Sequence, residues 1–252
     1  MRNNTKKKGI WDSIFAVLDY LFRIVMINLL IIIPAFFPVV IYSWLTGGDE
    51  NPNELVMYIT LIPALVYTFP AIVAACDVYR MYQEKLTKGV FKEFFKSFKK
   101  YFLKSFIISL IAVSVFIILT FRLNINGIKI NGPLIYFFEN FDNLICLIGL
   151  GITLSFVIIG CFLIIHLPLV MSYFEGLSLW QYFKLAFIMA FKKVGITILL
   201  LIIIVAFILI DLSFGIVTFI FGVSVPIYLL IKLSFKEYIK ICRKVERRED
   251  EN

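Results

Sequence analysis

The chain has 252 residues, of which 61% are hydrophobic, and it carries a formal net charge of +8. A mean hydropathy of +0.95 over the whole length exceeds what a soluble domain of this size can bury, so the composition excludes a water-soluble protein and indicates an integral membrane protein. A nucleic-acid-binding function is also excluded, because no solvated domain carries the basic and aromatic surface that such binding needs.

Six apolar runs predict membrane-spanning helices. The hydrocarbon core of a bilayer is about 30 Å thick, so a spanning helix needs roughly 20 apolar residues. The first run follows Lys6, Lys7 and Lys8, but it is too long for a cleaved signal peptide and lacks a small-residue cleavage site. The last two runs are separated only near Asp211 and Gly215, and their combined length suits two helices better than one. The predicted spans are 24–46, 55–75, 102–121, 144–170, 194–211 and 213–233.

The distribution of basic residues predicts the orientation. If both termini lie in the cytoplasm, 23 of the 25 Lys and Arg residues are on the inner side, and only Arg122 and Lys129 are outside. The net charge is then a consequence of topology. The predicted architecture is all-α and belongs in the cell membrane. It has a basic cytoplasmic N-terminus with an interfacial helix (1–23), a six-helix membrane domain (24–233) and a charged cytoplasmic tail (234–252).

Three amphipathic stretches precede the outward-going helices, at 10–23, 90–100 and 179–193. In the middle stretch, aromatic residues recur at helical spacing between lysines. This pattern is typical of a helix on the bilayer surface that turns its ammonium groups toward anionic head groups. The candidate lipid or partner contacts are Phe91, Lys92, Phe94, Phe95, Lys96, Phe98, Lys99 and Lys100, with Phe191, Lys192 and Lys193 in the third stretch.

These stretches belong to a hairpin pattern that occurs three times. Each returning helix has a proline near its cytoplasmic end, and an acid follows the first two of these prolines by seven residues. The pattern is either an internal duplication or a chance product of frequent Phe and Lys. The prolines are Pro70, Pro168 and Pro226, and the two acids are Asp77 and Glu175.

Polar groups and helix breaks at membrane depth are candidate sites, because lipid offers them no hydrogen-bond partners. Asn28 lies in the first span and is followed by Pro34 and Pro38, while Pro63 and Pro70 lie in the second. Each proline removes a backbone hydrogen bond. Either the two helices open a carbonyl-lined pathway for a solute, or the kinks shape packing and Asn28 binds a neighbouring helix. We favour the packing interpretation.

His166 is the single histidine and precedes Pro168 near the inner end of the fourth span. An imidazole at this position relays protons or senses pH, or it is a packed hydrogen-bonding group, which is the commoner role. Cys146 and Cys161 lie in an apolar run, while Cys76 and Cys242 lie at cytoplasmic membrane edges, so we expect neither a disulfide nor a metal site.

Several motifs spread along most of the chain resemble the YesL family of bacterial membrane proteins, which is classed as a domain of unknown function. They are Asn28-Leu29-Leu30 with Pro34, the segments 70–75 and 89–98, Leu167-Pro168-Leu169, and the stretch 184–192. The chain departs from the family at Tyr101, where Asn is frequent, and in a longer acidic loop at 47–54. The resemblance implies about six membrane helices and genes near those for sugar-uptake ABC transporters. It implies no catalytic or binding residues.

Three functions remain open on the sequence alone. The chain is an accessory of carbohydrate uptake that contacts a transporter permease, a small-solute carrier with a pathway near Asn28 and the prolines, or a scaffold that binds anionic lipid. An enzyme is disfavoured, since catalysis needs clustered titratable or nucleophilic groups and no such motif occurs. We expect no cofactor and no nucleic-acid partner, and we expect the lipid bilayer itself to be a partner.

Overall fold

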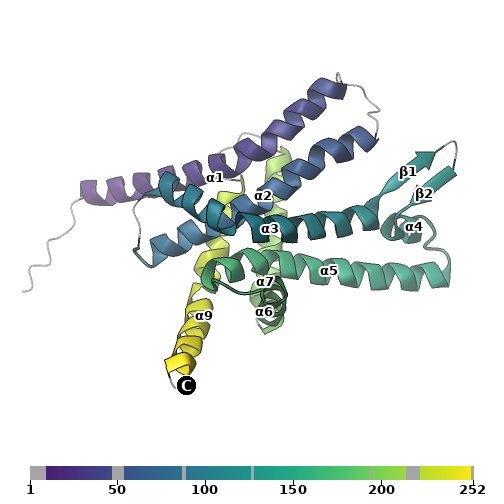
Figure 1. Ribbon diagram of the computed structural model, residues 1–252. Helices are drawn as coiled ribbons and strands as arrows, with labels where there is room; N and C mark the ends of the chain where they lie inside the picture. The colour runs from purple at the N-terminus through teal and green to yellow at the C-terminus, as the bar shows by residue number, and fades with distance from the viewer. Residues whose placement is uncertain are drawn as a thin grey trace, which may run out of the picture.

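The computed structural model describes residues 10–46, 54–86, 89–125, 128–192, 194–213 and 222–250. Predictions for residues 1–9, the acidic loop, Lys193 and the first half of the sixth span lie outside these ranges. Long helices form a bundle, and a small β-hairpin stands at one end of it (Figure 1). The helices are α1 (Ile10–Thr46), α2 (Glu54–Gln83), α3 (Val90–Thr120), α4 (Pro133–Glu139), α5 (Leu144–Tyr173), α6 (Leu179–Lys192), α7 (Val194–Ser213) and α9 (Ser224–Asp250).

Several of these helices are suited to cross a bilayer. Among the described residues, three segments are long and apolar enough, namely Ile62–Gln83 in α2, all of α3 and all of α5. The pair α6 and α7 adds a fourth if it is taken as one span that bends by 96°. The chain is therefore an apolar helical protein of the membrane class, while six spans and cytoplasmic termini stay predictions.

Helix α2 is the centre of the bundle. It packs between α1 and α3 and also contacts α5 and α9. Small residues allow neighbouring helices to approach its backbone closely, which is how helices associate in lipid without a hydrophobic driving force. The residues with 0% or 1% exposure in this helix are Ala71, Val73, Ala74, Ala75, Cys76 and Val78.

The C-terminal end of α2 is closed by a Schellman motif. Lys85 adopts φ +59°, and its N–H donates to Tyr82 O at 3.1 Å, while Leu86 N–H donates to Met81 O at 2.8 Å. These two bonds satisfy the last carbonyl groups of the helix and reverse the chain direction. The start of α3 is thereby returned to the side of α2.

The chain is predominantly helical, as expected, but the loop after α3 contains a short β-hairpin that was not predicted from the sequence. Strands β1 (Arg122–Ile125) and β2 (Ile128–Asn131) pair antiparallel, with Leu123 opposite Ile130. The sequence between them is Asn126-Gly127, the dipeptide most typical of a two-residue hairpin turn. The hairpin ends at Gly132, where an added Cβ would lie 2.6 Å from the carbonyl oxygen of Leu119. Only glycine allows this approach.

Of the three expected surface helices, one is a separate helix and two continue directly into the following span. The stretch 90–100 is not a helix lying apart on the bilayer, because α3 continues through it without a break. The stretch 10–23 likewise continues into the first predicted span as part of α1. By contrast, α6 is a distinct helix that bends sharply into α7. The three hairpin copies therefore differ in structure, whatever their origin.

Candidate functional site

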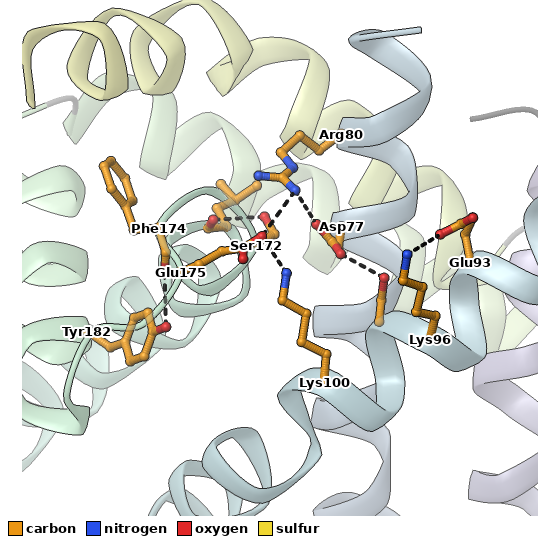
Figure 2. A network of polar contacts seen from close by, with 11 residues as sticks. Asp77, Arg80, Glu93, Lys96, Lys100, Ser172, Phe174, Glu175 and Tyr182 are labelled. Atoms are coloured by element: carbon orange, nitrogen blue, oxygen red, sulfur yellow. Dashed lines mark hydrogen bonds and ion pairs between the residues drawn. The ribbon is translucent and has the colours of Figure 1, made fainter. Parts of the chain in front are cut away.

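Four charged residues meet where the C-terminal ends of α2 and α5 converge with the first turns of α3, and we call them the charge cluster: Asp77, Arg80, Lys100 and Glu175. Asp77 and Arg80 lie one turn apart near the end of α2, Lys100 lies in the third turn of α3, and Glu175 follows α5 (Figure 2). The sequence pattern placed Asp77 and Glu175 in two copies of a repeat, and the fold brings both to one site.

The geometry of the charge cluster is that of a paired network. Arg80 Nη2 donates to Asp77 Oδ1 at 2.7 Å, and Ser97 Oγ donates to the other carboxylate oxygen at 2.7 Å. Lys100 Nζ pairs with Glu175 Oε1, and Arg80 Nη2 lies 3.9 Å from the same oxygen. The Lys100 ammonium holds the pKa of the Glu175 carboxyl below its usual range. Two acids and two bases therefore balance in charge.

Burial differs strongly across the charge cluster. The side chain of Asp77 is 4% exposed and that of Arg80 is 15% exposed, whereas that of Glu175 is 53% exposed. A buried carboxylate is stable only when paired and hydrogen-bonded, and both oxygens of Asp77 meet that requirement. Since these oxygens are already occupied, the arrangement is suited to holding helices together rather than to binding a ligand or taking up a substrate proton.

The loop between α5 and α6 is held by the same face of α3. Lys104 Nζ donates to Leu177 O at 2.7 Å, and the Tyr182 hydroxyl donates to Phe174 O at 2.9 Å. Lys104 is thus part of this contact. Together with the charge cluster, these bonds join α3 to α5 and α6.

The aromatic and basic residues at the start of α3 are divided between two faces. Phe94 is buried and Phe98 is half-buried against the bundle, so of these two candidate lipid or partner contacts Phe94 is not available as one. Lys100 is paired in the charge cluster. The other five candidate contacts in this stretch are all exposed. At 100° per residue they lie within an arc of about 140° around the helix axis, and thus on one face. We call them the α3 basic surface: Phe91, Lys92, Phe95, Lys96 and Lys99.

The corresponding residues of the third stretch are arranged differently. Phe191 packs against Phe187 at a ring-centroid distance of 4.5 Å and against Phe162 at 6.2 Å. Lys192 is exposed at the end of α6, and Lys193 lies outside the described residues. Phe187 and Phe191 remain exposed, as does Lys184. This stretch thus presents two lysines beside its rings, where the α3 basic surface has three.

Asn28 is fully buried and binds the start of α9. Its Oδ1 accepts hydrogen bonds from the backbone N–H groups of Val223 at 2.9 Å and Ser224 at 3.0 Å. The first N–H groups of a helix have no partner within it, so Asn28 acts as a cap supplied by another helix. This is the packing interpretation of Asn28, with α9 as the neighbouring helix.

The prolines leave the helices continuous. Pro70 removes the donor to Val66 O, and the hydroxyl of Ser109 in α3 donates to that oxygen at 3.1 Å instead. Pro63 is exposed and Pro38 is half-buried, while the side chain of Pro34 lies outside the described part. The carbonyl freed by Pro70 is thus used in helix packing. Pro168 is buried within α5.

His166 joins a hydrogen-bond chain across four helices. Thr197 Oγ1 donates to Ala190 O at 3.0 Å, so it accepts the hydrogen bond from His166 Nε2 at 2.9 Å. His166 Nδ1 then accepts from the Tyr238 hydroxyl at 3.0 Å. This pattern corresponds to a neutral imidazole protonated on Nε2. All three side chains are buried. The chain links α5 to α6, α7 and α9.

Sequence reasoning named Lys100 as a surface contact and did not identify Arg80, Ser97 or Tyr238. The hydrogen-bond partner of Ser97 lies 20 residues away in sequence, and that of Tyr238 lies 72 residues away. A usable signal existed at Asp77, since an acid flanked by an arginine one turn later predicts a helical pair. Among the described residues, no group of three or more His, Cys, Asp or Glu is placed to hold a metal ion, and Cys76, Cys146 and Cys161 are free thiols.

Comparison with known proteins gives one match. Residues 51–123 match a family model described as a protein of unknown function, DUF624. This segment contains α2 and α3, and thus three of the four residues of the charge cluster together with the α3 basic surface. No curated protein and no solved structure matches the chain. The match and the apolar helices together fit a membrane protein of unknown function.

Replacing Asp77 should destabilise the protein far more than replacing Glu175. Asp77→Ala leaves the largely buried guanidinium of Arg80 without its close partner, and we expect a loss of about 3–5 kcal/mol in the free energy of unfolding. Glu175→Ala removes a half-exposed partner and should cost about 1 kcal/mol or less. Reversible unfolding in mixed micelles measures both. Equal losses would mean that the charge cluster does not hold the helices.

Replacing Asn28 should loosen the start of α9. Asn28→Leu leaves two backbone N–H groups without an acceptor, and an unsatisfied buried donor costs about 1–3 kcal/mol. Hydrogen exchange at Val223 and Ser224 should accelerate accordingly. The control is Asn140→Leu, because Asn140 is exposed and its amide donates only to Tyr136 O at 2.8 Å. Unchanged exchange at both amides in Asn28→Leu would contradict the capping role.

Proposed function

We propose that this protein is a non-enzymatic accessory subunit of a bacterial ABC transporter and that it binds the transporter permease through the α3 basic surface. One observation carries the proposal. The α3 basic surface is exposed, while the opposite face of the same helix is held by the charge cluster through Ser97 and Lys100. A rigid, exposed set of lysines and aromatic rings suits an acidic protein surface, with aromatic residues as the apolar contacts.

The proposed orientation places this surface in the cytoplasm. The first support is the positive-inside distribution of Lys and Arg. The second is that the last turns of α2, the first turns of α3 and the end of α5 meet in one cluster, so these helix ends lie on the same side. The β-hairpin and α4 follow the far end of α3 and lie at the opposite end of the bundle (Figure 1). Six spans in the cell membrane with both termini inside complete the proposed topology.

The hydrogen bonds of the polar groups within the predicted spans favour an accessory role over that of a carrier. The Asn28 oxygen caps α9, and the carbonyl freed by Pro70 is bonded by Ser109. These are two of the groups on the proposed pathway of a carrier, which ran near Asn28 and the prolines of the first two spans. Because both are engaged in packing, neither is available to bind a polar solute.

Carbohydrate as the cargo of the transporter is supported by the resemblance to the YesL family, whose members tend to be encoded near sugar-uptake systems. The geometry of the chain does not depend on this choice. Anionic lipid is the alternative ligand of the α3 basic surface, since lysines near a bilayer attract acidic head groups at about 1 kcal/mol each. The two ligands predict different outcomes for the same variant.

Accessibility of two exposed positions tests the orientation. In a background without the natural cysteines, Lys92→Cys should react with a membrane-impermeant maleimide only after the cells are opened, because it lies on the proposed cytoplasmic end. Asp142→Cys should react in intact cells, because it follows α4 at the other end. Labelling of both from the same side would refute the topology.

Charge reversal tests the docking surface. In the variant Lys92→Glu/Lys96→Glu/Lys99→Glu, the amount of ABC permease that copurifies from native membranes should fall about tenfold or more, because like charges across an interface cost several kcal/mol. The fold should persist, since these lysines are exposed. Quantitative mass spectrometry of the permease subunit provides the measurement.

The matched control is Lys184→Glu/Lys236→Glu/Lys240→Glu, which reverses three exposed lysines on α6 and α9. It should retain the permease. If both variants lose the permease equally, net charge rather than the α3 basic surface is responsible. If the unmodified protein recovers no permease, while its enrichment of acidic phospholipid is lost in the first variant alone, the surface binds lipid and the accessory role is wrong.

A further inference from the structure

An apolar cavity of about 240 Å³ lies between α2, α5, α7 and α9. Helix α2 contributes Ile72 and Cys76, α5 contributes Pro168, α7 contributes Phe207, and α9 contributes Ile227. Cys76 directly precedes Asp77 of the charge cluster, so the cavity begins immediately beyond the inner polar layer and extends toward the middle of the bundle.

The lining of the cavity excludes water as a stable occupant. Among the side chains that line it, the thiol of Cys76 is the single group with a heteroatom. A buried water needs two to four polar partners, and apolar cavities of roughly 150 Å³ stay dry and accept small hydrocarbons instead. A larger space that is lined by apolar side chains and opens toward the surface of the bundle is suited to hydrocarbon.

A second cavity of about 280 Å³ lies on the other side of the same residues. It is lined by Ile108, Val113 and Phe116 of α3, and it shares Phe69 and Ile164 with the first cavity. The two spaces therefore adjoin at one pair of side chains. Adjoining spaces at this depth fit a long flexible chain better than a compact rigid molecule.

We infer that one acyl chain of a membrane phospholipid occupies the cavity between α2, α5, α7 and α9 as a bound ligand. Around helices suited to span a bilayer, acyl chains are the surrounding solvent and are present in large excess over any other apolar molecule. The inserted chain fills contacts that side chains leave open and connects α7 and α9 to the centre of the bundle. This inference is independent of any transporter partner.

The test uses a phospholipid with a photoreactive diazirine in its acyl chain, incorporated into nanodiscs with the full-length protein. After irradiation, peptide mass spectrometry should find label on Ile72 and Cys76. Cys76 is 0% exposed at the protein surface, so lipids that merely surround the bundle do not reach it. Label restricted to lipid-facing residues of α5 and α7 would overturn the inference. The same labelling pattern is expected if another part of the protein chain fills the cavity, and that outcome also overturns it.

A filled cavity provides the matched variant. In Ile227→Phe the added ring occupies the site, and labelling of Ile72 and Cys76 should fall about tenfold, because room for several methylene groups is lost. The control Ile202→Phe adds the same volume at a position that is 58% exposed and should leave the labelling unchanged. Equal labelling in Ile227→Phe would overturn the inference. If that variant does not fold, the pattern in the unmodified protein decides alone.

Discussion

The constraint on which this structure depends is that hydrocarbon supplies no hydrogen-bond partners, so each polar group inside the bundle must find one within the protein. The freed carbonyl of Val66 is bonded by Ser109, and the first amides of α9 are bonded by Asn28. In each case the donor and the acceptor come from different helices. The need to satisfy polar groups thereby determines which helices are neighbours, in a medium where apolar contact alone does not select them.

The same constraint explains where the charges are. Asp77 and Arg80 lie near the C-terminal end of α2, and the buried acid is bonded on both oxygens. Asn28, His166 and Thr197 instead form hydrogen bonds without net charge. The buried charge is thus paired within the charge cluster, and these other connections between helices are made by uncharged side chains, which are less costly to desolvate.

Patterns with a short period in sequence predicted much of the fold. The apolar runs correctly placed the helices that begin at Leu144 and Val194, because hydrophobicity is a local property of the chain. The hairpin at residues 122–131 had an equally local signal in Asn126-Gly127 between alternating apolar residues, but it was obscured by the expectation of helices throughout. The charge cluster was not predictable in this way, since its pairing of Lys100 with Glu175 depends on how α3 and α5 pack.

Some helices of the bundle are joined by hydrogen bonds and ion pairs, and others by apolar contacts. This difference affects which part of the chain presents an ordered surface to a partner. Helix α3 is joined to α2 and to the segment after α5 by directional bonds through Ser97, Lys100 and Lys104, so its exposed lysines have a defined position. Helices α7 and α9 are joined to α5 by the hydrogen-bond chain through His166, and they also face each other across an apolar cavity, where contacts are non-directional and a lipid chain can adapt to small shifts. A binding surface gains affinity when it is already ordered before binding. The start of α3 satisfies that condition.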